Sequence, residues 1–325
     1  MATCTTLALA LACLSFAAPT LAVPSNPFVK CPVTLEGRVS LNTTLETFNT
    51  PASLFNPDYT KGQNLSWSQI LQFPDTKPSR FDLPSHKALE VTIDDRSLFV
   101  PGGGKVQLGF RRAGLLMGNG SDASNVGVQT FHWSSKQVGG AKGSHAMNLT
   151  HEYMTVWHEA NDYASNQFSI NAGVMLSQDN PKEEGKPDST KLDKRLWKVL
   201  DRKNNVIWTG RIKYGVWQNF AITMDIEKKW VFQISRIGLC DTDDLWTLCS
   251  TLRVYYSEGY DRLKAVTPPV ANDNSGGGQY QIGILKKPTE TTSVVNDGYQ
   301  ESGIHEGQIY GGIFIENSSN NCISL

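Results

Sequence analysis

The sequence has 325 residues and a formal net charge of -1, with 19% charged and 10% aromatic residues. This length suits one large domain or two smaller ones, and the balanced charge without a basic block argues against nucleic acid and anionic membranes as partners. Residues 1–22 hold an apolar stretch followed by small residues, which predicts a cleaved secretory signal peptide even though no basic residue precedes the stretch. Because that stretch is too short to span a bilayer, we expect a secreted, extracellular protein in which residues 23–325 form a single domain.

Short stretches of alternating polarity, separated by Gly, Asn, Asp and Pro, follow one another along the chain, and helical periodicity is scarce. We expect strands within residues 88–100, 105–116, 128–137, 151–159, 166–176, 196–212, 217–226, 251–259, 276–287 and 307–316. A short helix is expected within residues 64–73, capped by Asn64 or Ser66. So many strands without intervening helices predict an all-β fold, an antiparallel β-sandwich of jelly-roll type.

Two segments have the composition of insertions between these strands. Residues 177–195 are charged and contain prolines, so we expect a solvated loop. Residues 230–250 separate two segments that would form a hairpin if they were joined directly. Two hypotheses for this second insertion stay open: a genuine loop closed by a disulfide bond, or the translation of an unspliced intron, whose length and ends it matches.

Four cysteines remain after the signal peptide, an even number that suits disulfide bonds in an oxidising compartment. A bond between Cys31 and Cys322 would join the two ends of the mature chain, and a bond between Cys240 and Cys249 would close a short local loop. Free buried thiols are the alternative. Five Asn-X-Ser/Thr sequons predict N-glycosylation of surface loops. Their asparagines are Asn42, Asn64, Asn119, Asn148 and Asn317.

The stretch NLTHEYMTVWHEANDYASNQF, residues 148–168, contains two His-Glu pairs seven residues apart. Zinc proteases need His-Glu-X-X-His on a helix, so this spacing in a strand pattern argues against a metal site, and we expect no cofactor. Side chains of a regular strand alternate between its faces. One face then carries Glu152, Met154, Val156 and His158, of which Met154 and Val156 suit the core. The other carries His151, Tyr153, Thr155, Trp157 and Glu159, where the two aromatic rings form either an open platform for sugar rings or a cap of the sandwich.

A pair of carboxylates is the better hypothesis for this stretch, because glycoside hydrolysis needs one carboxylic acid and one carboxylate. Glu152 and Glu159 face opposite ways on an unbroken strand, so they are not expected to act together unless a bulge intervenes, and Glu306 is a candidate partner. A buried ion pair with Arg111 or Arg112 is the alternative role for any one glutamate. Polar and aromatic side chains in other strands suggest the floor of a groove for an elongated neutral ligand. They are His132, Trp133, Gln279, Gln281, Gln308 and Tyr310.

Several motifs together resemble glycoside hydrolase family 131, a family of secreted fungal β-glucanases. The motifs are GFRRAGLL, TFHWSSKQ, NLTHEYMTVWHEANDYASNQF, KVLDRKNN, WQNFAITMD, NDNSGGGQYQIGILKKPT and EGQIYGGIFIE. The resemblance runs from about Cys31 to Leu325 and implies a β-jelly-roll with a concave substrate cleft. It also implies an inverting enzyme with exo activity on β-1,3 and β-1,6 glucans and endo activity on β-1,4 glucan. One departure is Gly114, because the arginine motif of the family is often followed by a glutamate, as in RRAEL.

We therefore expect a monomeric β-glucan hydrolase. Glu152 and Glu159, the acidic positions of the HEY…HE motif, are the first and second choice for the acid/base role, with aromatic surroundings that would hold a proton by desolvation. The expected substrate-binding side chains are Arg111, Arg112, Trp133, His151, Tyr153, Trp157, His158, Gln279, Gln281, Glu306 and Gln308. Two alternatives stay open: a non-catalytic β-glucan-binding protein, which Gly114 favours, and a polysaccharide lyase, since lyases also use jelly rolls with Arg, Gln, His and Tyr in the groove.

Overall fold

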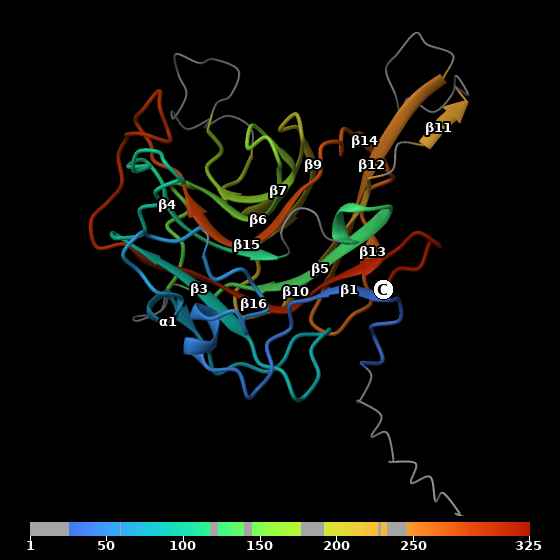
Figure 1. Ribbon diagram of the computed structural model, residues 1–325, viewed down its shortest axis with the longest axis horizontal. Coiled ribbons are helices and arrows are strands. Elements are labelled where there is room, and N and C mark those ends of the chain that lie inside the picture. The colour runs from blue at the N-terminus through green and yellow to red at the C-terminus, as the bar shows by residue number, and fades with distance from the viewer. Residues whose placement is uncertain are drawn as a thin grey trace, which may run out of the picture.

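Two antiparallel β-sheets packed face to face make up almost all the regular structure (Figure 1). The computed structural model describes residues 26–58, 60–117, 123–139, 145–176, 192–226, 229–232 and 246–325. The predicted all-β sandwich is confirmed, while its jelly-roll type stays a prediction. The expected signal peptide, Asn119, Cys240 and most of the insertion at 177–195 lie outside the described residues.

The larger sheet has ten strands, in the spatial order β11-β12-β10-β5-β16-β3-β2, with β1 beside β16 and both β13 and β14 beside β12. The strands are β1 (Val33–Glu36), β2 (Leu71–Gln72), β3 (Leu89–Asp94), β5 (Val128–Lys136), β10 (Gln218–Asp225), β11 (Lys229–Phe232), β12 (Trp246–Glu258), β13 (Lys264–Ala265), β14 (Val270–Asn272) and β16 (His305–Asn317). The two segments that flank residues 230–250 pair as expected, since β10 runs antiparallel to β12 with Met224 opposite Leu252.

The smaller sheet has six strands in the order β4-β15-β6-β7-β8-β9. They are β4 (Arg111–Met117), β15 (Gly278–Lys286), β6 (Glu152–Ala160), β7 (Asn166–Gly173), β8 (Leu196–Asp201) and β9 (Val206–Arg211). Figure 1 shows that this sheet is strongly curved and that its concave side points away from the larger sheet. The convex side therefore contributes to the core, and the concave side is the outer face on which a site can be built.

The main core fills the space between the two sheets and is rich in aromatic side chains. Trp133 of β5 stacks on Phe220 of β10 with ring centroids 5.3 Å apart, and Phe131 meets Tyr280 of β15 edge to face at 5.0 Å. Each such buried ring contributes about 1.5–3 kcal/mol through removal of apolar surface from water. These long-range contacts join β5, β10 and β15, which are far apart in the sequence.

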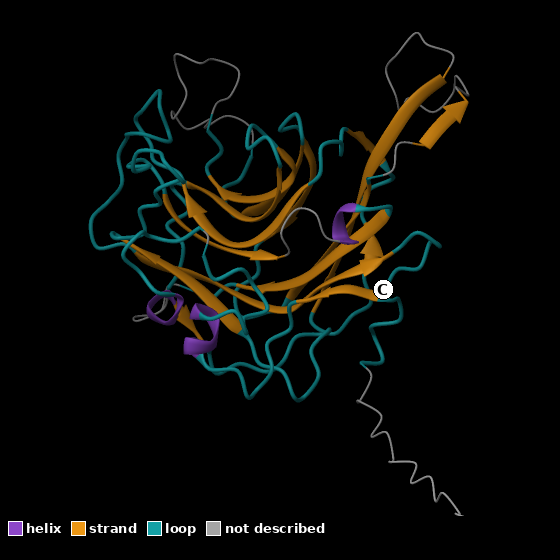
Figure 2. Ribbon diagram, viewed as in Figure 1, coloured by secondary structure: helices purple, strands orange, loops and turns teal. Residues whose placement is uncertain are grey.

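In the described ranges, three short helices lie at the margins of the sandwich (Figure 2). They are η1 (Leu45–Asn49), α1 (Trp67–Ile70) and η2 (Ala123–Asn125). The helix expected within residues 64–73 is α1, and Ser66 caps it in a reciprocal arrangement with Gln69. In the described part of the chain no helix is long and apolar enough to cross a membrane.

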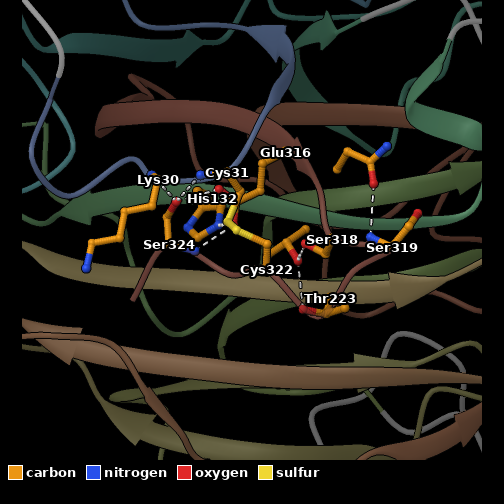
Figure 3. The surroundings of a disulfide bond; sticks show 11 residues. Lys30, Cys31, His132, Thr223, Glu316, Ser318, Ser319, Cys322 and Ser324 are labelled. Atoms are coloured by element: carbon orange, nitrogen blue, oxygen red, sulfur yellow. Dashed lines mark hydrogen bonds and ion pairs between the residues drawn. A yellow bond between two sulfur atoms is a disulfide. The ribbon is translucent and has the colours of Figure 1, made fainter.

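A disulfide bond joins Cys31 and Cys322, as predicted, and fastens both ends of the described domain to the outer side of the larger sheet (Figure 3). Next to it, the backbone N–H and the hydroxyl of Ser324 donate to the buried carboxylate of Glu316 at 2.8 and 2.6 Å. The imidazole Nε2 of His132 lies 2.9 Å from the same carboxylate. His132 thus contacts a buried carboxylate on this side of the molecule and takes no part in a groove on the other sheet.

The sequons at Asn42, Asn64 and Asn317 are exposed, as glycosylation requires. Asn148 is half-buried, and its side-chain amide donates to Glu301 at 2.8 Å. Glycosylation of these asparagines stays a prediction. The Cys240–Cys249 bond also stays a prediction, because Cys240 lies outside the described residues.

Candidate active site

A β-bulge interrupts β6 in the middle of the two His-Glu pairs. The pairing with β7 shifts between Met154 and Val156, and the pairing of β15 with β6 shifts between Ile282 and Leu285. A second shift in the pairing with β7 lies between His158 and Glu159. A bulge adds one residue to a strand, so the side chains on its two sides no longer belong to one simple alternation. Tyr153 and Val156, an odd number of residues apart, consequently both pack into the main core.

The bulge places Glu152, Met154, Trp157 and Glu159 together on the outer face of β6. Met154 and Trp157 form a separate cluster with Leu285 of β15, outside the main core. The expectation that Glu152 and Glu159 face opposite ways is therefore wrong, because the strand is not regular. The two glutamates share a face because a bulge lies between them.

Neighbouring strands add polar side chains to the same face, because residues directly opposite one another in a sheet point the same way. Gln279 and Gln281 of β15 lie opposite Glu159 and Trp157, and Asn171 of β7 lies opposite Met154. In β4, Arg112 lies opposite Leu285, and Gly114 lies opposite Gly283. We call the following set the outer face: Arg112, Gly114, Glu152, Met154, Trp157, Glu159, Asn166, Asn171, Gln279, Gln281 and Leu285.

The centre of the outer face is closed by packing, and Trp157 is 0% exposed there. The guanidinium carbon of Arg112 lies 5.8 Å from the Trp157 ring and 5.2 Å from the ring of Phe99. A Cβ atom on Gly114 would come within 2.9 Å of both Trp157 Cη2 and Gln281 Oε1. The glycine therefore gives Trp157 the room to pack against β4. Of the two alternatives that the sequence left open for Trp157, the open platform for sugar rings is not the one observed.

At one end of the outer face, Glu159 is half-buried and reaches solvent. Its Oε2 accepts a hydrogen bond from the side-chain amide of Gln281 at 2.5 Å. Burial lowers the pKa of the Arg112 guanidinium, and the negative charge of Glu159 acts in the opposite direction. A carboxylate, an amide and a guanidinium are thus electrostatically coupled beside the buried Trp157.

At the other end, Glu152 is fully buried and its carboxylate is saturated by donors. Oε1 accepts from Asn171 Nδ2 at 2.6 Å and from Lys287 Nζ at 2.8 Å, and Oε2 accepts from the Leu176 backbone at 2.9 Å. These contacts describe a structural carboxylate paired with a cation. The Glu152 carboxylate contacts polar and charged groups instead of the aromatic side chains that were expected to hold its proton.

Lys198 of β8 belongs to the same end of the sheet. Its ammonium group donates to the carbonyls of Gly173 and Leu196 at 2.8 and 3.2 Å. Burial lowers the pKa of Lys198 to about 8, against the opposing effects of the charges on Glu152 and Asp193.

The two glutamates of the outer face are too far apart to act as one catalytic pair. They are seven residues apart on one strand, which corresponds to about 20 Å at the rise of a β-strand. Paired carboxyl groups in glycosidases lie about 5–9.5 Å apart, including those with an intervening water. One of the two can therefore serve catalysis, and the other has a different role.

Four buried polar atoms of the outer face have no hydrogen-bond partner among the residues that the structure describes. They are Arg112 Nε, Trp157 Nε1, Asn171 Oδ1 and Gln281 Oε1. Buried polar groups are normally paired, so each calls for an explanation. Two of these atoms are donors and two are acceptors.

The family model described as "Glycoside hydrolase 131 catalytic N-terminal domain" matches residues 33–321. The chain belongs to glycoside hydrolase family 131. The resemblance carried by the sequence motifs is thereby confirmed, and so is the assignment to glycoside hydrolases.

Two solved family 131 structures share the fold. The catalytic domain from Coprinopsis cinerea has 16% sequence identity and a TM-score of 0.58 over 88% of this chain and 94% of that one. The β-glucanase catalytic domain from Podospora anserina has 18% identity and a TM-score of 0.59 over 88% of this chain and 96% of that one. No curated protein matches the chain.

In this family 131 domain, several expected substrate-binding side chains face the core between the sheets. Trp133 lies in the aromatic core, and His158 meets the ring of Tyr280 edge to face at 4.2 Å. Gln308 accepts from Gln137 and donates to the backbone carbonyl of Ile309 at 2.8 Å. The alternation of these polar and aromatic residues was recognised correctly. Their side chains, however, point into the core and not into a groove.

Glu306 also points inward, which removes it as a catalytic partner. Its Oε1 pairs with Lys286 Nζ at 2.7 Å, and its Oε2 accepts from the Tyr153 hydroxyl at 2.6 Å. Burial, together with the negative charge of Glu306, raises the pKa of Tyr153 far above its ordinary value. Lys286 also pairs with Glu301 at 2.5 Å, and Glu301 lies 3.0 Å from His151 Nε2. Tyr153, His151 and Glu306 therefore belong to one buried structural network.

Arg111 and Arg112 differ as adjacent strand residues should. Arg112 lies on the outer face, whereas Arg111 donates to the backbone carbonyls of Leu108 and Phe110 at 2.9 and 3.1 Å. Of the expected binding residues, the outer face thus keeps Arg112, Trp157, Gln279 and Gln281. Among the residues that the structure describes, no group of three or more His, Cys, Asp or Glu side chains is arranged to hold a metal ion.

Sequence reasoning missed three polar side chains at the Glu152 end: Asn171, Lys198 and Lys287. A signal for one of them was present, because the adjacent lysines 286 and 287 lie at the end of a strand and must point to opposite faces. Asn171 and Lys198 became recognisable only once β7 and β8 were placed beside β6.

Proposed function

We propose that this family 131 domain is a secreted, monomeric β-glucan hydrolase that binds a glucan chain along the outer face of the smaller sheet. The observation that carries this proposal is the arrangement around Glu159. It is a half-exposed carboxylate, bonded to Gln281 and next to unpaired donors and acceptors on Arg112, Trp157 and Gln281. Membership of a glycoside hydrolase family, and the β-glucanase from Podospora anserina with the same fold, support the substrate class.

Glu159 is the residue to which we assign the acid/base role. It can exchange a proton with a substrate or with water because it reaches solvent, whereas the carboxylate of Glu152 is enclosed by three donors. Gln281 orients the Glu159 carboxylate, and Arg112 places a positive charge beside it. Gln279, directly opposite Glu159, is positioned to bond sugar hydroxyls.

The finer activity that we propose is exo cleavage of β-1,3 and β-1,6 glucans and endo cleavage of β-1,4 glucan, with inversion. The sequence motifs shared with family 131 support this assignment. Inversion requires a water molecule between an acid and a base about 6.5–9.5 Å apart. Glu152 is too distant for the second role, so that group comes from outside the set defined as the outer face.

A non-catalytic β-glucan-binding protein is the second candidate, and Gly114 favours it. Gly114 of β4 lies opposite Gly283 of β15, and Gly283 lies in the part of β15 that runs alongside β6 between Glu152 and Glu159. A glutamate at position 114 would therefore point onto the outer face between these two residues. In this chain the position carries no side chain, and Trp157 packs there instead.

Incubation of the purified protein with laminarin, lichenan and cello-oligosaccharides separates the two candidates. Release of reducing sugar supports the hydrolase, and NMR of the first product anomer then distinguishes inversion from retention. Binding of these glucans without any release supports the binding protein and contradicts the hydrolase. An ultraviolet-absorbing unsaturated product from a uronic-acid polymer would instead indicate lyase action.

A further inference from the structure

Tyr163, in the turn between β6 and β7, is the most exposed large hydrophobic side chain in the described part of the chain, at 69%. Its backbone has φ of +57°, in the left-handed region. A bulky residue there is an outlier, and such strained positions concentrate at ligand-binding sites. A glycine or asparagine would fit this turn with less strain, so the presence of an exposed ring at this position needs an explanation.

The turn that carries Tyr163 is held in one conformation from inside. The Ala160 backbone N–H donates to the Ser165 carbonyl, and the Tyr163 N–H donates to the Ala160 carbonyl, both at 2.9 Å. The Asp162 side chain accepts from the Ala164 backbone at 3.0 Å. The strained φ is therefore fixed by the hydrogen bonds around it.

Two neighbouring loops hold the turn from outside. Asn161 Nδ2 donates to the Gly276 carbonyl at 2.9 Å. Arg202, in the turn between β8 and β9, donates to Ser165 Oγ at 3.0 Å and to the Ser275 carbonyl at 3.1 Å. A side chain presented by such a braced turn loses little conformational freedom when it binds a ligand, which favours affinity.

Tyr163 lies in the turn that begins where β6 ends, beyond Glu159 and Ala160. It follows Glu159 by four residues, which corresponds to at most about 13 Å along the chain and to a span of a few sugar rings. Trp157 is 0% exposed and cannot stack on a ligand, whereas the ring of Tyr163 is open. Gln279, opposite Glu159, adds an amide to the same end.

We propose that Tyr163 is a stacking platform for a glucosyl ring of a neutral glucan chain, in a subsite beyond Glu159. The apolar face of a sugar ring covers the phenol ring, and the amides of the outer face bond the hydroxyls. This subsite rests on the proposed β-glucan hydrolase function. It serves long chains, because a short oligosaccharide bound at Glu159 does not extend to the turn.

The test compares Tyr163→Gly with Tyr163→Phe. Glycine adopts the left-handed turn freely and removes the ring, and it is expected to unfold no earlier than the wild type on heating. Phenylalanine keeps the ring and removes only the hydroxyl. Tyr260→Ala is the matched control, because Tyr260 is also exposed (56%) but donates to the Pro78 carbonyl at a different place on the molecule.

The measurement is KM and kcat on a series of β-glucan oligosaccharides of increasing length, with equilibrium binding of laminarin by affinity electrophoresis. In the wild type and in Tyr163→Phe, KM falls as the chain becomes long enough to reach the turn. In Tyr163→Gly this fall is lost, and the dissociation constant for long chains rises about tenfold, as expected for one uncovered aromatic face. Tyr260→Ala behaves as the wild type.

An active protein whose Tyr163→Gly variant keeps the wild-type dependence of KM on chain length overturns the subsite and leaves the proposed function standing. A wild type that binds but does not hydrolyse glucans ends the hydrolase proposal. The subsite then stands if Tyr163→Gly weakens laminarin binding about tenfold, and it is overturned if the affinity is unchanged. A wild type that neither binds nor cleaves any β-glucan overturns both.

Discussion

Replacing Glu152 with glutamine separates the structural role of this residue from a catalytic one. The substitution keeps the shape but removes the negative charge opposite Lys287, whose side chain is only 17% exposed. It also places an NH2 group where a carboxylate oxygen accepted from Asn171 and Lys287, or from the Leu176 backbone. Leaving a buried cation without its partner costs about 3–5 kcal/mol.

The partial exposure of Lys287 puts the expected loss at the lower end, about 3 kcal/mol, and such a loss lowers the Tm of a domain of this size by roughly 6–12 °C. Guanidinium unfolding followed by tryptophan fluorescence measures it as a lower midpoint at unchanged slope. Glu159→Gln is the comparison variant, because Glu159 is half-exposed and bonds one side-chain amide. It also removes the negative charge that acts on the buried Arg112, so this variant is expected to lose about 1–2 kcal/mol, less than Glu152→Gln. A Glu152→Gln variant of wild-type stability but with activity reduced a hundredfold or more would refute this account of Glu152.

Three further predictions concern the rest of the molecule. The folded pKa of Lys198, about 8, lies below its ordinary 10.5, so the unfolded chain binds this proton more tightly and stability rises between these pH values, by up to about 3 kcal/mol. Urea unfolding at pH 7 and pH 10 shows the rise in the wild type and a smaller one in Lys198→Met; equal rises contradict the prediction. The double variant Cys31→Ser, Cys322→Ser removes the disulfide, whose cysteines are separated by 291 positions, and lowers the free energy of unfolding by about 5–6 kcal/mol in the chain-entropy model. An unchanged denaturation midpoint contradicts this prediction. Gly114→Glu displaces Trp157 and Gln281 and lowers stability by about 1–3 kcal/mol with a shift in tryptophan emission, whereas unaltered emission means that the space is already open.

The strands, the sandwich and the terminal disulfide could be predicted from the sequence because each depends on a local pattern or on few alternatives. Alternating polarity marks a strand regardless of its partners. Each of the ten expected ranges overlaps a strand, and the range 196–212 holds two, β8 and β9. The short helix followed from the capping residues Asn64 and Ser66, and the structure shows that Ser66 is the cap. The Cys31–Cys322 bond followed from the position of the two cysteines at the ends of the mature chain.

The faces of the strands could not be assigned with the same success. The bulge in β6 depends on its pairing with β7, and it reverses the face of every residue beyond it. Glu306 and Gln308 are polar on the correct period, but they point into the core, where Lys286 and Gln137 satisfy them. Both partners come from distant segments, so one sequence does not show that such polar residues are buried.

The rate of β-glucan hydrolysis by Glu159→Gln, relative to the wild type and at an equal folded fraction, tests the central claim most directly. Loss of a general acid or base reduces the rate by about 10²–10⁴-fold. The account predicts a loss in this range for Glu159→Gln on laminarin or lichenan, measured on the folded fraction of the protein. A Glu159→Gln variant that keeps its rate within a few fold contradicts the assignment of the catalytic carboxylate.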